Sequence, residues 1–112
     1  MKVRTMFNYS YNDITHRYPK GVKPLLNILN DWLEERELVG EAFFCSPEVW
    51  KERGEEYCLS AEAIIVFDSS PMYEMMNGEF GWQLREQFDN LLRSKGYYME
   101  LGEAWFGGIY RE

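Results

Sequence analysis

The run Ala63–Phe67 is five consecutive apolar residues, and it restricts the possible folds more than any other segment. A run this short with polar residues on both sides is typical of a strand. Successive side chains of a strand face opposite sides, so Ile64 and Val66 point one way and the other three point the other way. A strand with one wet face would alternate with polar residues. The sequence therefore predicts a strand over residues 61–67 that is buried on both faces.

The segments before this strand predict a strand, a helix and a second strand. Residues 3–11 alternate with a period of two, which is typical of a strand. A helix is predicted from about residue 22 to 38, with Pro24 in its first turn and Gly40 beyond its end. A short strand follows over residues 41–45. The apolar stripe of the helix is Leu25, Leu26, Ile28, Leu29, Trp32 and Leu33.

Two Ser-Pro pairs each predict the start of a short helix. Serine caps the free backbone N–H groups of a first turn, and proline fits the first helical position. Ser46-Pro47 predicts a helix near residues 47–53, and Ser70-Pro71 predicts one near residues 71–77. We expect one of these helices, or a second protein molecule, to cover the open face of the sheet. The methionines expected to provide that cover are Met72, Met75 and Met76.

A longer helix is predicted over residues 79–95, followed by extended segments over residues 97–101 and 104–110. Its expected inward residues are Phe80, Leu84, Phe88, Leu91 and Leu92. The pattern of residues 40–44, Gly-Glu-Ala-Phe-Phe, recurs at residues 102–106 as Gly-Glu-Ala-Trp-Phe. This repetition supports two related halves within a single domain of residues 1–112.

The order of elements predicts an α+β two-layer sandwich of the ferredoxin-like, split βαβ type. It has about four antiparallel strands, two main helices, and the short extra helices near residues 47–53 and 71–77. In such a fold the two main helices cover one face of the sheet. The first and third strands lie in its centre.

Charge is distributed unevenly along the 112 residues, whose net charge is −7. Residues 1–24 carry five basic and one acidic side chain, a net charge of +4. Residues 25–112 carry seven basic and eighteen acidic side chains, a net charge of −11. An acidic body attracts basic partners and repels nucleic acid and anionic membranes. We therefore expect a protein partner with a basic surface and no direct nucleic acid or membrane binding, unless residues 1–24 form a basic patch of their own.

The cysteine and histidine pattern indicates neither a metal site nor a disulfide framework. Cys45 and Cys58 fit neither a CxxC pair nor a zinc knuckle, and His16 is the only histidine. No apolar run approaches the roughly 20 residues of a membrane-spanning helix, and the first residues lack a signal-peptide block. We expect a cytoplasmic protein with no metal and no cofactor.

Asp68 follows the apolar strand directly, a position where working residues are common. The favoured interpretation is that Asp68 ends the strand and bonds its own turn. The alternative is a small-ligand or enzymatic cleft that uses Asp68 and Tyr73, which requires burial of the carboxylate.

Carboxylates and aromatic rings concentrate on the first long helix and the first short one. If the fold brings them together, they form a negative field with aromatic anchors, which suits a basic partner. The alternative is that they only keep the protein soluble. The residues of this predicted surface are Glu34, Glu35, Glu37, Trp50, Glu52, Glu55, Glu56 and Tyr57.

The leading hypothesis is a small, acidic, non-enzymatic protein-binding domain. It would inhibit or regulate a basic nucleic-acid-binding partner, by functional analogy with small phage anti-defence proteins of the anti-CRISPR kind. The second hypothesis is the ligand-binding or enzymatic cleft near Asp68. The third is a homodimeric structural module joined through the open face of the sheet.

Overall fold

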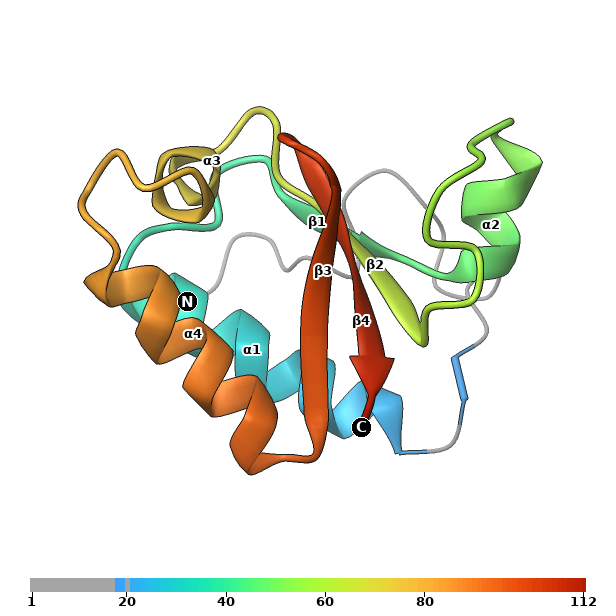
Figure 1. Cartoon of the computed structure of the whole chain (residues 1–112), viewed down its shortest axis with the longest axis horizontal. Helices are drawn as coiled ribbons and strands as arrows, with labels where there is room; N and C mark the ends of the chain where they lie inside the picture. The colour runs from blue at the N-terminus through green and yellow to red at the C-terminus, as the bar shows by residue number, and fades with distance from the viewer. Residues whose placement is uncertain (1–17, 20) are drawn as a thin grey trace.

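The computed structural model describes residues 18, 19 and 21–112 (Figure 1). Its elements follow the predicted order from the first helix onward. The predicted strand over residues 3–11 lies outside the described residues. In chain order the elements are α1 (Val22–Glu35), β1 (Phe43–Cys45), α2 (Pro47–Glu52), β2 (Ala63–Val66), α3 (Pro71–Met76), α4 (Gln83–Ser94), β3 (Tyr97–Glu103) and β4 (Phe106–Arg111).

The strands form one antiparallel sheet in the order β1-β2-β4-β3, which confirms the α+β class. The third predicted strand is β2, and it is central as expected. The other central strand of the described sheet is β4. Val66 of β2 lies opposite Phe43 on one side and Phe106 on the other. The two segments with the repeated Gly-Glu-Ala pattern therefore lead into strands that flank the same neighbour.

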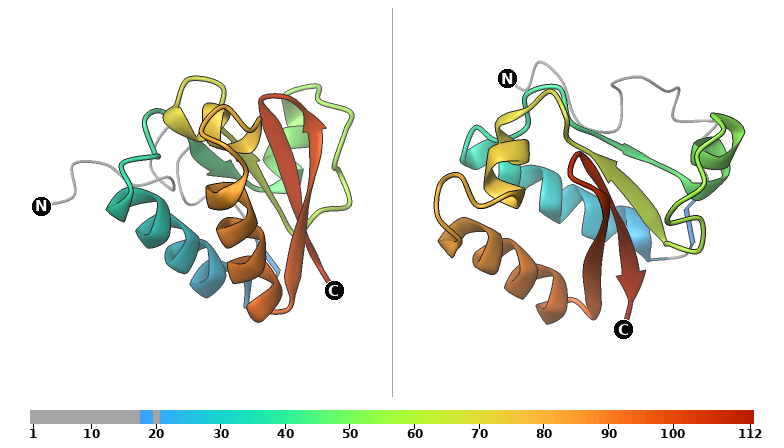
Figure 2. Two further views of the ribbon diagram at one scale, coloured as in Figure 1. Left: turned by 60° about the vertical axis from the view of Figure 1, so that its left-hand side comes forward. Right: turned by 45° about the horizontal axis from the view of Figure 1, so that its top comes forward.

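Both faces of β2 are buried, as its apolar run predicts. Ala63, Ile65 and Phe67 belong to a first core cluster with residues of α1, α3 and α4. Ile64 and Val66 belong to a second cluster, which includes Trp50 of α2. Figure 2 shows α1 and α4 on one side of the sheet and α2 on the other. The predicted cover by a Ser-Pro helix is thus confirmed, and that helix is α2.

The three methionines of α3 do not cover that face, so this prediction is wrong. Their side chains are fully buried in the first cluster, on the same side of the sheet as α1 and α4. The backbone N–H of Met72 donates to the carbonyl oxygen of Leu38 at 3.2 Å. This bond ties the start of α3 to the segment after α1 and holds α3 in the main helical layer.

Both predicted Ser-Pro helix starts are confirmed by side-chain caps. The Ser46 hydroxyl accepts from the backbone N–H of Val49 at 3.3 Å. The Ser70 hydroxyl accepts from the N–H of Met72 at 3.1 Å and donates to the carbonyl of Phe67 at 3.2 Å. Ser70 therefore joins the end of β2 to the start of α3.

The long helices are shorter than predicted. α1 ends three residues early, and Ile28 on its predicted inner stripe is 37% exposed. α4 begins at Gln83 because Gly81 adopts φ +81°, a left-handed conformation that interrupts a helix. Phe80 precedes this break and is 53% exposed, so its predicted inward position is wrong. Within the described residues, no helix has the length and apolar character needed to cross a membrane.

Gly107 and Gly108 allow neighbouring segments to approach β4 closely. A Cβ atom on Gly107 would lie 2.9 Å from the carbonyl oxygen of Glu100. One on Gly108 would lie 3.0 Å from the Cβ atoms of Ala61 and Cys58. The glycine pair thus serves close packing at the centre of the sheet.

Candidate functional site

Trp50 anchors α2 to the sheet. Its side chain is fully buried, with ring centroids 4.9 Å from Phe106 and 6.1 Å from Trp105. The guanidinium of Arg53 lies 5.0 Å from the Trp50 ring centre, a cation–π contact. Since Trp50 has no exposed surface, it supports this region from beneath and presents no ring to a partner, in contrast to its predicted role as an exposed anchor.

The same tryptophan also fixes the loop that follows α2. The Trp50 Nε1–H donates to the carbonyl oxygen of Tyr57 at 3.1 Å. The side chain of Tyr57 itself is 59% exposed. A partly buried hydrogen bond therefore fixes the backbone from which the exposed aromatic ring projects, which lowers the ordering entropy that binding would lose.

Carboxylates precede this exposed ring closely in the chain. Glu52 and Glu56 are exposed, and Glu55 is half-buried in an ion pair with Arg53, with nitrogen and oxygen 3.9 Å apart. Residues 46–62 carry five acidic and two basic side chains, so the segment is net negative. We call the residues Glu48, Glu52, Glu55, Glu56 and Tyr57 the α2 surface.

The predicted acidic residues of α1 do not join the α2 surface. Glu35 and Glu37 are exposed and Glu34 is half-buried at the C-terminal end of α1. Figures 1 and 2 place that end at the opposite side of the molecule from α2. The structure therefore divides the single predicted field into two separate acidic regions.

Asp68 and Tyr73, the residues of the alternative cleft, lie in different environments. Asp68 is exposed, whereas Tyr73 is half-buried and packs against the first core cluster. The buried carboxylate that this alternative requires is therefore not at Asp68. The capping role in this turn belongs to Ser70.

The two cysteines are close to the second core cluster, and both are free thiols. Burial raises the pKa of Cys45 to about 12. The pKa of Tyr110 is raised chiefly by burial and then by its hydrogen bond with the half-buried Cys58. Among the residues that the structure describes, no group of three His, Cys, Asp or Glu side chains is arranged to hold a metal ion.

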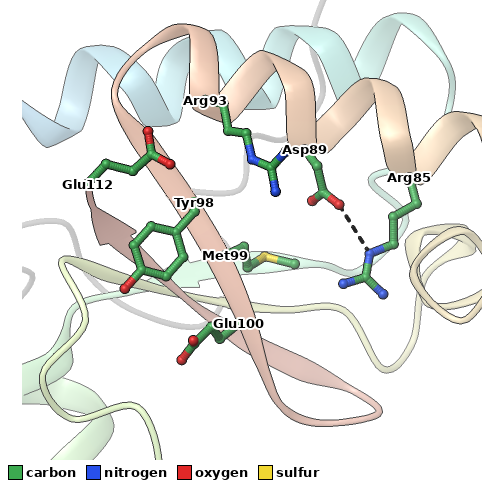
Figure 3. A pocket seen from close by; sticks show the side chains of 7 residues that line it. All are labelled: Arg85, Asp89, Arg93, Tyr98, Met99, Glu100 and Glu112. Atoms are coloured by element: carbon green, nitrogen blue, oxygen red, sulfur yellow. Dashed lines mark ion pairs between the residues drawn. The ribbon is translucent and has the colours of Figure 1, made fainter.

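Sequence reasoning missed a groove between α4 and β3 (Figure 3). Its volume is about 480 Å³. The Arg85 Nε lies 3.6 Å from Asp89 Oδ2, and Arg85 Nη1 donates to the carbonyl of Met76 at 2.9 Å. Burial raises the pKa of Asp89, although both neighbouring arginines lower it. The lining residues are Arg85, Asp89, Arg93, Tyr98, Met99, Glu100 and Glu112.

A sequence signal for this groove exists in the spacing of its helical residues. Arg85, Asp89 and Arg93 recur every four residues and so share one stripe of α4. Trp82 continues the stripe and is 61% exposed, with the Arg85 guanidinium 6.0 Å from its ring centre. Tryptophan and arginine are enriched at protein interfaces.

Comparison with known proteins identifies no relative of this chain. No protein-family model, curated protein or solved structure matches the chain.

Proposed function

We propose that the protein is a small protein-binding domain whose α2 surface docks a basic surface of another protein. The observation that carries this proposal is the exposed Tyr57 ring, whose backbone is fixed by the Trp50 hydrogen bond in an acidic segment of the chain. An aromatic ring gives a partner a large contact area, and the carboxylates give the encounter its direction. The partner class that fits best is a nucleic-acid-binding protein, because its basic surface complements this field.

The domain would act as an inhibitor or regulator by occupying that basic surface. Nucleic acid and the α2 surface would compete for the same arginine and lysine side chains, since both present anionic oxygen atoms to them. Neither a reaction nor a cofactor is needed for this mode of action. Binding should weaken as salt rises, because ions screen exposed charges that lie more than about 8 Å apart at physiological ionic strength, and this distance shortens as salt is added.

Affinity capture followed by direct measurement tests the proposal. The full chain is used to retain proteins from the lysate of its host at low and high salt, and the retained proteins are identified by mass spectrometry. The dissociation constant of the purified partner is then measured for wild type and for Tyr57→Ala and Glu52→Lys. We expect Tyr57→Ala to weaken binding by at least about 20-fold, as hot-spot residues do.

A charge reversal elsewhere controls for net charge. Glu35→Lys changes the net charge by the same amount as Glu52→Lys, but it lies on the exposed end of α1, far from α2. The proposal requires Glu52→Lys to weaken binding more than Glu35→Lys. Equal effects of the two reversals, or full affinity in Tyr57→Ala, would exclude the α2 surface as the docking site.

A positioning role for Trp50 can be measured in the same assay. Trp50→Phe keeps a ring in the core and removes the donor to the Tyr57 carbonyl. It should weaken partner binding and speed hydrogen exchange in residues 53–62. Trp32→Phe, which alters a half-buried tryptophan of α1, should leave both properties unchanged.

For the fold, we propose a ferredoxin-like arrangement in permuted order. β2, α4 and β3 form a split βαβ unit, since both strands run antiparallel to the intervening β4. β4, α1 and β1 would form the second unit, since β4 and β1 both run antiparallel to β2. Arg111 and Gly21 line the same shallow hollow, so the end of β4 lies close to the start of α1. This proximity supports the proposal that the order of elements in this chain is a circular permutation of the ferredoxin-like order.

A homodimer through the open face of the sheet is the remaining alternative for the partner. That hypothesis requires an apolar face of the sheet without cover, and α2 of the same chain covers the face that carries Ile64 and Val66. A light-scattering mass of two chains that reverts to one chain in an α2 variant would favour the homodimer. A mass of one chain at high concentration would exclude it.

A further inference from the structure

β3 is an edge strand of seven residues, and within the described part of the chain it pairs only with β4. Its outer backbone N–H and C=O groups therefore have no strand partner among residues 18, 19 and 21–112. Edge strands are usually protected by lysine, proline or a bulge. Residues 97–101 contain neither lysine nor proline, and the register shift lies beyond them, at Leu101 to Glu103.

The groove beside this edge has a defined chemistry on its helical side. Tyr97, Met99 and Leu101 contact the first core cluster, so their side of β3 faces the helical layer. An added strand would place every second side chain on that same side, next to α4. There it would meet the guanidiniums of Arg85 and Arg93 (Figure 3).

Arg93 supplies the guanidinium that is not held in an ion pair. Asp89 is paired with Arg85 at 3.6 Å, whereas the guanidinium of the exposed Arg93 makes no hydrogen bond or ion pair with any residue that the structure describes, although its charge acts on Asp89. Glu100 belongs to the opposite face of β3 by strand alternation, and Figure 3 shows it on the far side of the strand from the arginines. On the helical side of the groove the Arg93 guanidinium is thus available to a carboxylate, while Asp89 and Glu112 contribute negative charge to the same groove.

We propose that the free edge of β3 binds an extended segment of a partner protein as a fifth strand, with acidic side chains of that segment facing Arg93 and Arg85. Main-chain hydrogen bonds would supply affinity, and the arginines would select acidic side chains. Trp82, exposed at the adjoining surface of α4, offers an apolar contact to the same segment. This site is separate from the α2 surface and does not depend on it.

Two synthetic peptides test the proposal on the full chain. The acidic probe is Thr-Glu-Val-Glu-Val-Glu-Thr, whose glutamates all lie on one side of an extended strand, and the basic probe has lysine in place of glutamate. We expect the acidic peptide to bind with a Kd below about 1 mM in fluorescence anisotropy. The basic peptide should bind at least about tenfold more weakly. Amide NMR signals of residues 97–101 should shift with the acidic peptide.

Charge variants locate the contact. Arg93→Glu should weaken the acidic peptide by about tenfold or more, the effect of losing one charge-assisted contact. Lys95→Glu makes the same change of charge at an exposed position outside the groove, and it should alter the Kd by less than about threefold. Tyr57→Ala should not affect peptide binding, which separates this site from the α2 surface.

Four results would overturn the proposal. They are no binding of the acidic peptide, equal binding of both peptides, equal effects of Arg93→Glu and Lys95→Glu, or shifts confined to amides outside β3. A light-scattering mass of two chains, with concentration-dependent shifts in residues 97–101 and no peptide present, would instead assign this edge to a second copy of the chain.

Discussion

Cys45 and Cys58 show how far the environment of one residue type differs within this molecule. Cys45 lies in β1 with no exposed surface, and burial disfavours its thiolate strongly. Cys58 is half-buried, adopts φ +65°, and hydrogen-bonds Tyr110. Thiolate is the reactive form of cysteine. Cys45 should therefore be inert in the folded protein, and the contrast has a consequence for stability at alkaline pH.

Stability should fall as pH rises above about 9, in part because of Cys45. The unfolded thiol ionises near its ordinary pKa of 9.0, whereas the folded thiol keeps its proton up to about 12. The unfolded state thus loses a proton that the folded state retains, so the free energy of unfolding falls by up to about 1.4 kcal/mol per pH unit in this window. Urea unfolding of wild type and Cys45→Ala between pH 8 and 10.5 measures the difference in slope.

The Cys45→Ala variant should be less stable at pH 7, but its free energy of unfolding should fall less steeply with pH in the alkaline range. Val49→Ala removes buried apolar atoms from the same cluster without removing a titratable group, so it should keep the wild-type slope. Parallel pH profiles for wild type and Cys45→Ala would show that the folded thiol ionises as readily as the unfolded one.

Residue exposure was the least predictable property from sequence. Trp50 was predicted to be an exposed anchor and is buried, whereas Phe80 was predicted to be buried and is 53% exposed. The burial of Trp50 depends on a neighbour distant in the chain, and the exposure of Phe80 depends on the backbone conformation of the next residue. Trp50 is covered because α2 packs on the second face of β2, and Phe80 is excluded from α4 by the left-handed Gly81.

At the scale of elements, local signals with a definite chemistry predicted most of the fold. The Ser-Pro pairs located α2 and α3, and the apolar run located β2 and its double burial. The groove between α4 and β3 was not predicted, since it requires knowing that these two elements lie side by side. The stripe from Arg85 to Arg93 was visible in the sequence, but its strand neighbour was not.

The two serine caps should differ in their contribution to stability. Ser46→Ala removes the cap that accepts from the Val49 N–H. Ser70→Ala removes a cap to Met72 and a second bond to the Phe67 carbonyl, which would stay buried without this donor. We expect Ser46→Ala to lower the free energy of unfolding by about 1 kcal/mol and Ser70→Ala by about 2–3 kcal/mol. Chemical denaturation followed by circular dichroism compares them, and equal losses would contradict the second bond.

At the scale of the whole molecule, the position of β4 distinguishes the structure from the predicted one. The element order was predicted from local periodicity, but strand order depends on long-range pairing that periodicity does not encode. The predicted fold gave the position beside β2 to an N-terminal strand, whereas β4 occupies it in the described sheet. The proposed circular permutation makes the central position of β4 testable.

A chain that begins with residues 105–112 and continues through a flexible linker to Met1 and on to Ala104 should fold. A Gly-Ser linker of about 20 residues spans about 25 Å on average, comparable with the dimensions of the molecule, 34 × 33 × 25 Å. We expect a native-like circular dichroism spectrum and a cooperative thermal transition. A matched permutant opened between Ile64 and Ile65 should remain unfolded. A failure of both permutants to fold would argue against the permuted relationship.

The central position of β4 also sets when this protein can fold during its synthesis. The stretch between Val66 and Phe106 takes about 2–8 s to translate at about 5–20 residues per second. During this time β2 lacks the neighbour that Phe106 to Arg111 will supply, so the sheet cannot be completed. A ribosome that stalls before residue 106 would release a chain without a complete sheet. Such products should be recognised by proteases as unfolded. Only chains translated beyond residue 111 can therefore form the complete sheet and escape degradation.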